Sequence, residues 1–543
     1  MKRLFSFFSN DDNGDGHDPS EQSIPWLHSP SIYDHILENL DPETGRLKRE
    51  GINLPDEERR YANSKLRWVP GALEGSFGPQ LGTESASQKA HLVATYIINI
   101  EKRNLLEDKI ALYNLLLDDD LLGYVDQTLE QVVNAGVTTI HSHIHDFALF
   151  LAKDAPDRGP VKFAIALLGI LGGEGEKEII SILGRQEEFT LYSAVALSNS
   201  LADAEPELWQ LAQKVDGWGK IQIVNRISST DSPEIKNWLL LEGYRNNIMN
   251  EYLAFACATG GDLKQALSVE DIDNDLLDSA GEIIEALITG GPAQDINDYQ
   301  DAGFVILMYL KHLEPRSTKL NHFVTADLIL SYLTNDSNHL SSENGWNENT
   351  INASIQIARL ILEQPHWVPL VEQGLASNDN IHFYLANRAA QSLGIDTWDV
   401  HWKKLQDNPL QDRLWFPVME RSNPENIESI LDFAIRVLPF DQVAIGAADE
   451  MGFFGSEFAT HRCLDVIVQS LRNYPNLGWP LIAASLQSPV IRNRNMALVA
   501  LSKWDRSNWT AEIEEALLNA REAEPREDVK ESIEKVVNGE SII

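Results

Sequence analysis

Cysteine is nearly absent from this sequence, which has only two cysteines, Cys257 and Cys463, in 543 residues. Two thiols cannot make the dense disulfide framework on which small secreted domains depend. Both cysteines lie within apolar runs, where a small thiol packs as a hydrophobic side chain. We therefore expect a protein of the reducing cytoplasm, with both cysteines in its core.

Long hydrophobic runs are also missing. No stretch approaches the roughly 18 consecutive apolar residues that a membrane-spanning helix needs. The basic start at residues 1–8 contains only about five apolar residues, interrupted by Ser6, and this is too short for the core of a signal peptide. We therefore expect no membrane span and no export.

Basic residues are scarce relative to acidic ones. The chain has 44 Lys and Arg against 82 Asp and Glu, which gives a formal net charge of −38. A surface of that sign repels phosphate backbones and anionic lipid headgroups, so nucleic acid and membranes are disfavoured as partners, and a nucleic-acid enzyme with them. The same charge favours a basic protein partner, and it also fits a surface that is acidic only for solubility.

One hexapeptide pattern occurs twice, as SPEIKN at 232–237 and as SPVIRN at 488–493. Serine can cap a helix by accepting a hydrogen bond from its first turn, and proline is tolerated at the next position because no N–H is needed there. After the second copy, apolar residues recur at helical spacing. We predict that Ser232 and Ser488 each start an amphipathic helix that needs a neighbouring helix. The residues of the second stripe are Val490, Ala497, Leu498, Leu501 and Trp504.

The chain as a whole has helical patterns one after another and no convincing alternation of period two, which predicts an all-α fold. We expect Trp68, Leu73 and Phe77 of an irregular N-terminal segment to cover the end of the helical stack, because a bare terminal repeat would leave its core face wet. The expected parts are an acidic tail (1–25), the N-terminal capping segment (26–90), a helical repeat block (91–334), a polar loop (335–350) and a second repeat block (351–538).

A repeated unit of one short helix, a tight turn and one longer helix fits 367–393 and 479–501. Three places also share an apolar residue followed by Arg or Lys near a helix start: Ile235-Lys236, Ile491-Arg492 and Val529-Lys530. This pattern of helix pairs resembles HEAT and armadillo-type repeats. The distance along the chain from Ile491 to Val529 is close to the roughly 40 to 47 residues of one repeat of that class. The resemblance implies antiparallel helix pairs stacked into a right-handed α-solenoid, whose second helices line an inner surface that holds a protein partner. It implies no chemistry.

A histidine cluster offers the alternative function. His141, His143 and His145 precede Asp146, and on a helix His141 and His145 would share one face. Imidazoles at that spacing can hold Zn²⁺ if Asp146 or a distant carboxylate supplies a third ligand. A polar first helical turn would carry the same histidines without any metal. A metal-dependent enzyme centred on this cluster is therefore the alternative to a binding protein without cofactors.

Three basic residues are the candidates for contact with a partner. Arg494 lies in the apolar stripe of its helix, where its charge needs an acidic group. That group is either a carboxylate of a neighbouring repeat or part of a bound partner. Arg492 points away from the stripe, and with Lys236, its counterpart in the other copy, it is free to contact a partner.

Catalytic patterns are weak elsewhere. Asp449 and Glu450 near His461 lack a third member and a glycine loop. Residues 11–16 match the first half of a calcium loop, but Gln22 stands where the bidentate glutamate belongs. The sequence therefore favours a non-catalytic protein-binding or scaffold protein of the inhibitor or immunity type, which captures a basic partner.

Overall fold

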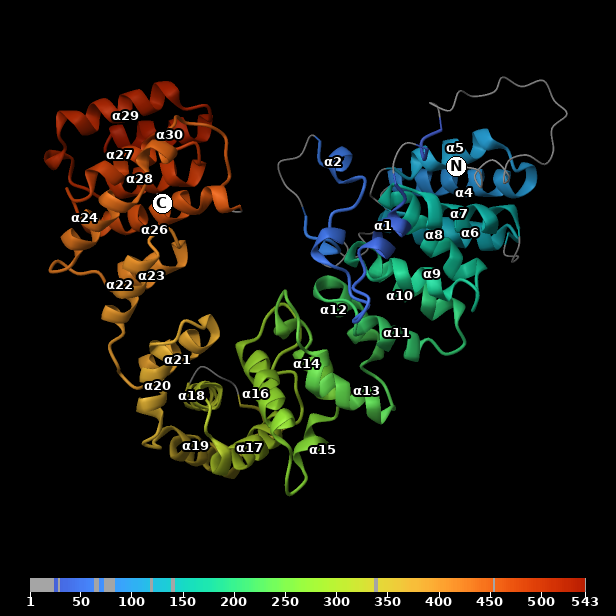
Figure 1. Cartoon of the computed structure of the whole chain (residues 1–543), viewed down its shortest axis with the longest axis horizontal. Coiled ribbons are helices and arrows are strands. Elements are labelled where there is room, and N and C mark those ends of the chain that lie inside the picture. The colour runs from blue at the N-terminus through green and yellow to red at the C-terminus, as the bar shows by residue number, and fades with distance from the viewer. Residues whose placement is uncertain are drawn as a thin grey trace. The chain divides into compact units, whose positions relative to one another are not determined.

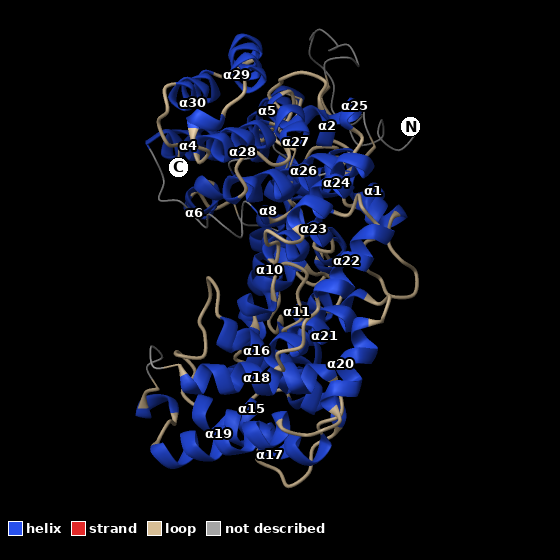
Figure 2. Cartoon of the chain, turned by 90° about the vertical axis from the view of Figure 1, so that its left-hand side faces the viewer, coloured by secondary structure: helices blue, strands red, loops and turns tan. Residues whose placement is uncertain are grey.

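The computed structural model describes residues 24–27, 30–62, 68–72, 84–117, 121–137, 142–335, 340–452 and 455–542. Within these ranges every named element is a helix, and the only extended pairings are two isolated bridges (Figure 2). The predicted all-α class is confirmed. No helix in the described ranges is long and apolar enough to cross a membrane.

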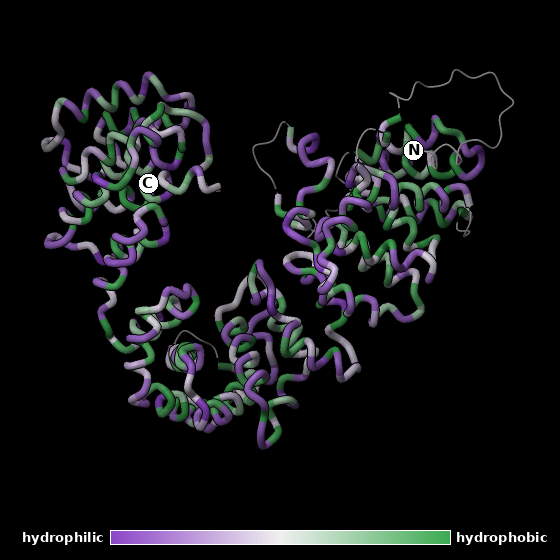
Figure 3. Tube along the Cα trace, viewed as in Figure 1, coloured by the Kyte–Doolittle hydropathy of each residue, from purple (hydrophilic) through white to green (hydrophobic). Residues whose placement is uncertain are grey.

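The chain divides into two compact units, 1–364 and 365–543 (Figure 1). The division falls beyond the predicted polar loop at 335–350, because α19 (Glu348–Leu362) packs back on α17 (Ala302–Leu313) and α18 (Leu320–Thr334). Apolar and polar residues are interspersed along the helices of both units, as expected of amphipathic helices (Figure 3).

The N-terminal unit contains one continuous row of helices. In this row α8, α10, α12, α14, α16 and α18 each pack on the next member, while α9 and α11 pack on α10 and α12. The remaining bounds are α1 (Ile32–Glu38), α2 (Glu57–Arg60), α4 (Glu84–Arg103), α5 (Leu106–Leu115), α6 (Val125–Asn134), α7 (His143–Asp154), α8 (Arg158–Leu171), α9 (Lys177–Leu183), α10 (Glu187–Ser200), α11 (Glu205–Ala212), α12 (Gly217–Ile227), α13 (Pro233–Trp238), α14 (Ala254–Gly260), α15 (Leu263–Leu267) and α16 (Asn274–Thr289).

Helix α8 is the most buried helix of this row. All but two of its fourteen residues are buried, and it ends at Leu171 with Gly172 as its C-cap. Gly169 permits its close approach to α10, because a Cβ there would lie 2.7 Å from the Cα of Ala196. The helix also buries Lys162, whose Nζ donates to Glu188 Oε1 at 2.7 Å.

The segment before α4 lies along the turns that precede α8, α10 and α12. Asp56 Oδ2 accepts the backbone N–H of Arg158 at 2.9 Å, and the Gln186 side chain donates to the Ile52 carbonyl at 2.9 Å. The Arg158 guanidinium also pairs with Asp56. Gly71 N donates to Glu188 Oε2 at 3.3 Å. We call residues 31–72 of this segment the N-terminal strap.

The packing of Trp68, Leu73 and Phe77 over the end of the stack stays a prediction. Polar contacts hold the described part of the segment along the edge of the helix row, where the buried Arg158 needs the Asp56 carboxylate beside it. Trp68 remains 47% exposed. Leu73 and Phe77 lie outside the described residues.

The C-terminal unit is built from helix pairs. The pairs α20–α21, α22–α23, α27–α28 and α29–α30 pack within themselves, and α23, α26, α28 and α30 pack on one another in that order. The bounds are α20 (Trp367–Leu375), α21 (Asn380–Ser392), α22 (Trp398–Asp407), α23 (Asp412–Glu420), α24 (Ile427–Val437), α25 (Phe440–Val443), α26 (Ala459–Ser470), α27 (Trp479–Leu486), α28 (Ile491–Ser502), α29 (Ala511–Ala523) and α30 (Glu527–Val537).

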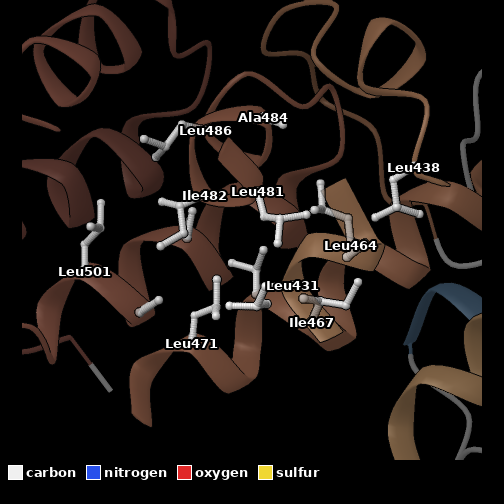
Figure 4. Packing of buried hydrophobic residues seen from close by; sticks show 14 of the residues in the cluster. Leu431, Leu438, Leu464, Ile467, Leu471, Leu481, Ile482, Ala484, Leu486 and Leu501 are labelled. Carbon is white, nitrogen blue, oxygen red and sulfur yellow. The ribbon is translucent and has the colours of Figure 1, made fainter. Parts of the chain in front are cut away.

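The predicted unit of a short helix followed by a longer one is confirmed twice here. Helices α20 and α27 have 9 and 8 residues, and α21 and α28 have 13 and 12. One apolar core joins the helices from α22 to α30, and in it Leu431, Leu464 and Leu481 meet from α24, α26 and α27 (Figure 4). The predicted stripe of α28 belongs to this unit's buried residues.

The two copies of the hexapeptide fold differently at their serines. Ser232 caps α13 as predicted, because its Oγ accepts the Ile235 N–H at 3.4 Å and Pro233 is the first helical residue. The prediction for Ser488 is wrong, because α28 begins only at Ile491 and the Ser488 Oγ accepts from Val490 N. A short bridge to Glu450 holds this copy extended for longer, with Ile491 N donating to the Glu450 carbonyl at 3.0 Å.

Substitution of these serines by alanine should therefore have unequal effects. Ser232→Ala removes one cap at a partly exposed helix start, and we expect a loss of about 1 kcal/mol of unfolding free energy. Ser488→Ala removes a fully buried hydroxyl that also donates to Asn493 Oδ1, and we expect a loss of about 2 kcal/mol. Urea unfolding of the two variants tests the order, and a smaller loss for Ser488→Ala would contradict it.

Candidate partner-binding site

A pocket of about 280 Å³ opens in the C-terminal unit, between α23, α26, α28 and the loop that precedes α26. Arg492, a predicted partner-binding residue, is part of its wall. Buried, charged and apolar side chains all contribute to it. The lining residues are Asp412, Arg413, Phe416, Met451, Gly452, His461, Arg462, Asp465, Val466, Val490, Arg492 and Asn493.

The rim of the pocket is held by backbone pairing between loop 446–452 and the turn before α28. Gly446 N donates to the Gln487 carbonyl at 2.9 Å, and Glu450 N donates to the Pro489 carbonyl at 3.2 Å. Gly452 has a φ of +66°, and a Cβ at this position would lie 2.7 Å from Val490 Cγ1. Only glycine fits this position, and it fixes the neighbouring Met451 at the pocket rim.

Gly452→Ala should therefore destabilise the C-terminal unit. The change adds both the cost of a positive φ and a contact that is too close, and we expect a loss of about 2 to 3 kcal/mol. Gly394→Ala is the matched control, because Gly394 has a φ of +69° with open space around its Cβ position. Urea unfolding measures both, and equal losses would show that the Val490 contact relaxes at no cost.

The floor of the pocket is a buried polar cluster. His461 Nδ1 lies 3.1 Å from both Ser488 Oγ and Asn493 Oδ1, and Asn493 Nδ2 donates to the His461 carbonyl at 2.8 Å. Burial lowers the pKa of His461, so the imidazole is neutral at neutral pH. Because Asn493 Oδ1 can only accept, the imidazole proton is on Nδ1.

This cluster does not have the arrangement of a catalytic serine and histidine. Ser488 is fully buried, its hydroxyl donates to Asn493 Oδ1 at 2.9 Å, and its oxygen accepts from the Val490 N–H. A nucleophile must reach its substrate, and this oxygen faces the protein interior. The cluster instead fixes the start of α28, which carries Arg492 into the pocket wall.

Two of the three arginines that line the pocket are paired. Arg462 Nε donates to Asp412 Oδ2, and Arg492 Nε donates to Asp465 Oδ2. Burial raises the pKa of Asp465 in spite of the attraction of Arg492. Each aspartate thus already has a cationic neighbour.

Arg413 is the third arginine and differs from the other two. Its side chain is exposed, and its Nη2 donates to the amide oxygen of Asn380 at 3.1 Å. It forms no ion pair among the described residues. With the two paired arginines and a neutral His461, the side chains around the pocket carry one uncompensated positive charge.

Apolar side chains flank this charge. Phe416 is 56% exposed and Met451 is 45% exposed, and both line the pocket. A second hollow shares Phe416, Asp465, Val466 and Arg492 with the first, and extends along α26 to Tyr474. Exposed aromatic and methionine side chains beside arginines are typical of protein–protein contact surfaces.

The other predicted partner-binding residues lie elsewhere. Arg494 is 2% exposed and pairs with Glu524, whose carboxylate accepts from its Nε and Nη2 at 2.7 and 2.8 Å. The acidic group expected for Arg494 is thus Glu524, which directly follows α29 in the same chain. The Arg494 guanidinium does not reach the pocket surface. Lys236 is partly exposed on α13 and belongs to the N-terminal unit, whereas all residues that line the pocket belong to the C-terminal unit.

The predicted histidine cluster is only partly described. Helix α7 begins at His143 with Ser142 as its N-cap, and His141 lies outside the described residues. His145 is buried, with Nε2 3.3 Å from Glu176 Oε1 and Nδ1 3.8 Å from Asp146. In the described part of the chain no three His, Cys, Asp or Glu side chains are grouped to hold a metal.

Sequence reasoning missed Arg413, Phe416, Met451 and Arg462. Phe416 lies in an apolar run in which its neighbours Trp415 and Val418 are fully buried. Only the arrangement of the surrounding helices decides which member of such a run stays exposed. The glycines at 446, 452 and 455 were an available signal, because they interrupt the helical pattern directly before α26.

Comparisons with known proteins assign no relative. No family model matches the chain, and no curated protein matches it. Among solved structures, the chain is similar to the crystal structure of an engineered protein at 14% sequence identity, over 82% of this chain and 98% of the other. The TM-score of that match is 0.23, too low to carry an argument about this chain.

Proposed function

We propose that this chain is a non-catalytic, HEAT-like α-solenoid that binds a protein partner through α23, α26 and α28 of its C-terminal unit. The observation that carries the proposal is the pocket on α23, α26 and α28, where Phe416 and Met451 are exposed beside Arg413 and Arg492. A soluble surface seldom leaves such side chains together unless something covers them.

The packing order supports the solenoid part of the proposal. In the N-terminal unit a row of alternate helices from α8 to α18 is continuous, and in the C-terminal unit α23, α26, α28 and α30 form a second such row. Rows in which each helix packs on the next member in this way are typical of repeat proteins. The right-handed sense is part of the resemblance to HEAT repeats.

The net charge of −38 supports a basic partner. An acidic surface speeds the approach of a basic protein by long-range attraction, and the rate falls as salt screens the charges. An inhibitor or immunity protein that captures a basic enzyme works in this way. The pocket then supplies the short-range contacts that hold the partner.

Co-purification from the native cell tests the proposal if two matched variants accompany the wild type. Phe416→Asp places a charge on the exposed apolar wall of the pocket. Leu518→Asp makes the same kind of change on α29, where Leu518 is 54% exposed and away from the pocket lining. Quantitative mass spectrometry should find one basic protein that is at least tenfold depleted with Phe416→Asp and retained with Leu518→Asp.

The salt dependence of the association rate is the second part of this test. The association rate of the recovered partner should fall as salt rises, because the Debye length shrinks from about 10 Å at 0.1 M to about 3 Å at 1 M. A partner that is retained equally by both variants would contradict the role of the pocket. A partner that binds at a rate independent of salt would contradict electrostatic capture.

A further inference from the structure

We infer that the pocket on α23, α26 and α28 binds an extended segment of the partner in which a glutamate or aspartate stands next to an aliphatic or aromatic residue. The carboxylate lies on the Arg413 guanidinium, and the apolar side chain lies between Phe416 and Met451. This inference rests on the proposed function, because the segment belongs to the bound protein.

Charge complementarity favours a carboxylate over a cation. Asp412 and Asp465 are already paired with Arg462 and Arg492, so neither offers an uncompensated negative charge. Arg413 contacts only an amide oxygen, and one added carboxylate neutralises it. A lysine or arginine placed beside Arg413 would instead meet a like charge, because both aspartates that line this pocket are already paired.

Unused hydrogen-bond donors point to the same ligand. Among the described residues, Nη2 of Arg462 and Nη1 of Arg492 donate to no protein acceptor, although their other nitrogens do. Arg413 uses only its Nη2. Planar guanidinium groups bind carboxylates in a bidentate way, and such charge-assisted bonds are about twice as strong as neutral ones.

The pocket is preorganised for this contact. His461, Ser488 and Asn493 are at least nine-tenths buried and hydrogen-bonded to one another, so the base of α28 does not have to order when a ligand binds. Asp465, which orients Arg492, has a side chain only 13% exposed. Arg492 is therefore held in place by Asp465 and Gln469 of α26.

Size favours a side chain over a cofactor. A volume of about 280 Å³ lies at the lower limit of small-molecule pockets, which begin at about 300 Å³. The second hollow continues past Phe416 and Arg492 along α26, so an extended chain, at about 3.3 Å per residue, can place its next residues there. The apolar contact with Phe416 and Met451 distinguishes such a segment from a free carboxylate ion.

Methionine methyl NMR provides a direct measurement, because the chain has only six methionines and Met451 lies on the pocket rim. The probes are the blocked hexapeptide acetyl-Gly-Ser-Leu-Glu-Ser-Gly-amide and versions with Gln or Lys in place of Glu. Met451→Leu assigns the signal. We expect the Glu peptide to shift the Met451 methyl signal in a saturable way, with at least tenfold weaker binding of the Gln peptide and none of the Lys peptide.

Arg413→Gln should weaken the Glu peptide at least tenfold and leave the Gln peptide unchanged. Arg506→Gln is the control, because Arg506 is exposed in the same unit outside the pocket. The inference is overturned if the Lys peptide binds as well as the Glu peptide, if Arg413→Gln has no effect, or if acetate shifts Met451 as strongly as the peptide.

The two proposals fail in different ways. If Phe416→Asp abolishes partner capture but the Glu peptide leaves Met451 unmoved, the carboxylate segment is wrong and the binding function stands. If the Glu peptide binds but Phe416→Asp leaves partner capture intact, the pocket is a carboxylate site and the proposed surface for the partner is wrong.

Discussion

Arg494→Met lowers the free energy of unfolding of the C-terminal unit by about 3 to 5 kcal/mol. The Arg494–Glu524 pair is almost completely buried, with side-chain exposures of 2% and 1%. Removal of the guanidinium leaves the Glu524 charge in the interior. It also removes the donors to the Ser488 and Pro489 carbonyls, at 2.8 and 3.0 Å. The turn before α28 then loses its anchor as well.

Urea unfolding and amide hydrogen exchange of α28 in the full chain measure this loss. Arg521→Met is the matched control, because the Arg521–Glu534 pair is about half exposed on both sides and such pairs contribute less than about 1 kcal/mol. Arg494→Met/Glu524→Met should recover part of the loss, since no charge is then left buried. A loss below 1 kcal/mol in Arg494→Met would mean that water reaches Glu524.

Glu187→Gln stabilises the N-terminal unit, and does so only at higher pH. Burial and, to a smaller extent, the nearby Asp216 raise the pKa of Glu187 to about 7, although the backbone N–H groups of Gly219 and Trp218 oppose the shift. Glu187 Oε2 is buried and accepts no hydrogen bond. An ionised carboxylate is therefore poorly satisfied at this position.

The sign of the pH dependence follows from the raised pKa. Between about pH 4.5, the ordinary value, and about pH 7, the unfolded chain releases the proton while the folded chain keeps it. Stability therefore falls as pH rises through this window, by about 3 kcal/mol in total, and stays low above it. Below about pH 4.5 both states are protonated and the penalty vanishes.

Urea unfolding at pH 4 and pH 8 tests this prediction. Glu187→Gln keeps the oxygen that accepts from the backbone but has no charge, so its gain should be about 3 kcal/mol at pH 8 and close to zero at pH 4. Glu270→Gln, at an exposed glutamate, should change little at either pH. An equal gain at both values would mean that the effect is packing and not ionisation.

Local patterns predicted much of the fold. The all-α class, the Ser232 cap and the paired helices at 367–393 and 479–501 depend on spacing and capping within a few residues of each other. The need of Arg494 for an acid was also predictable, because a charge inside an apolar stripe must be compensated. The identity of that acid could not be predicted, since Glu524 lies 30 residues further along the chain.

The pocket and the strap depend on contacts between distant segments, which no local pattern contains. Ser488 fails as a cap because Glu450, from another loop, pairs with the turn. Arg158 precedes an apolar run and Lys162 interrupts it. Arg158 pairs with Asp56 and Lys162 pairs with Glu188, and both acids come from other segments. The exposure of Phe416 likewise depends on the helices around it.

The N-terminal strap has a consequence for the order in which this protein folds during synthesis. Its hydrogen-bond partners lie far along the chain. Arg158 follows Asp56 by 102 residues, Glu188 follows Gly71 by 117, and Gln213 follows Arg46 by 167. Chains grow at about 5 to 20 residues per second, so the strap leaves the ribosome many seconds before its partners exist. Asp56 is thus already made when Arg158 emerges, and docking of the strap on the helix row supplies that buried cation with its carboxylate.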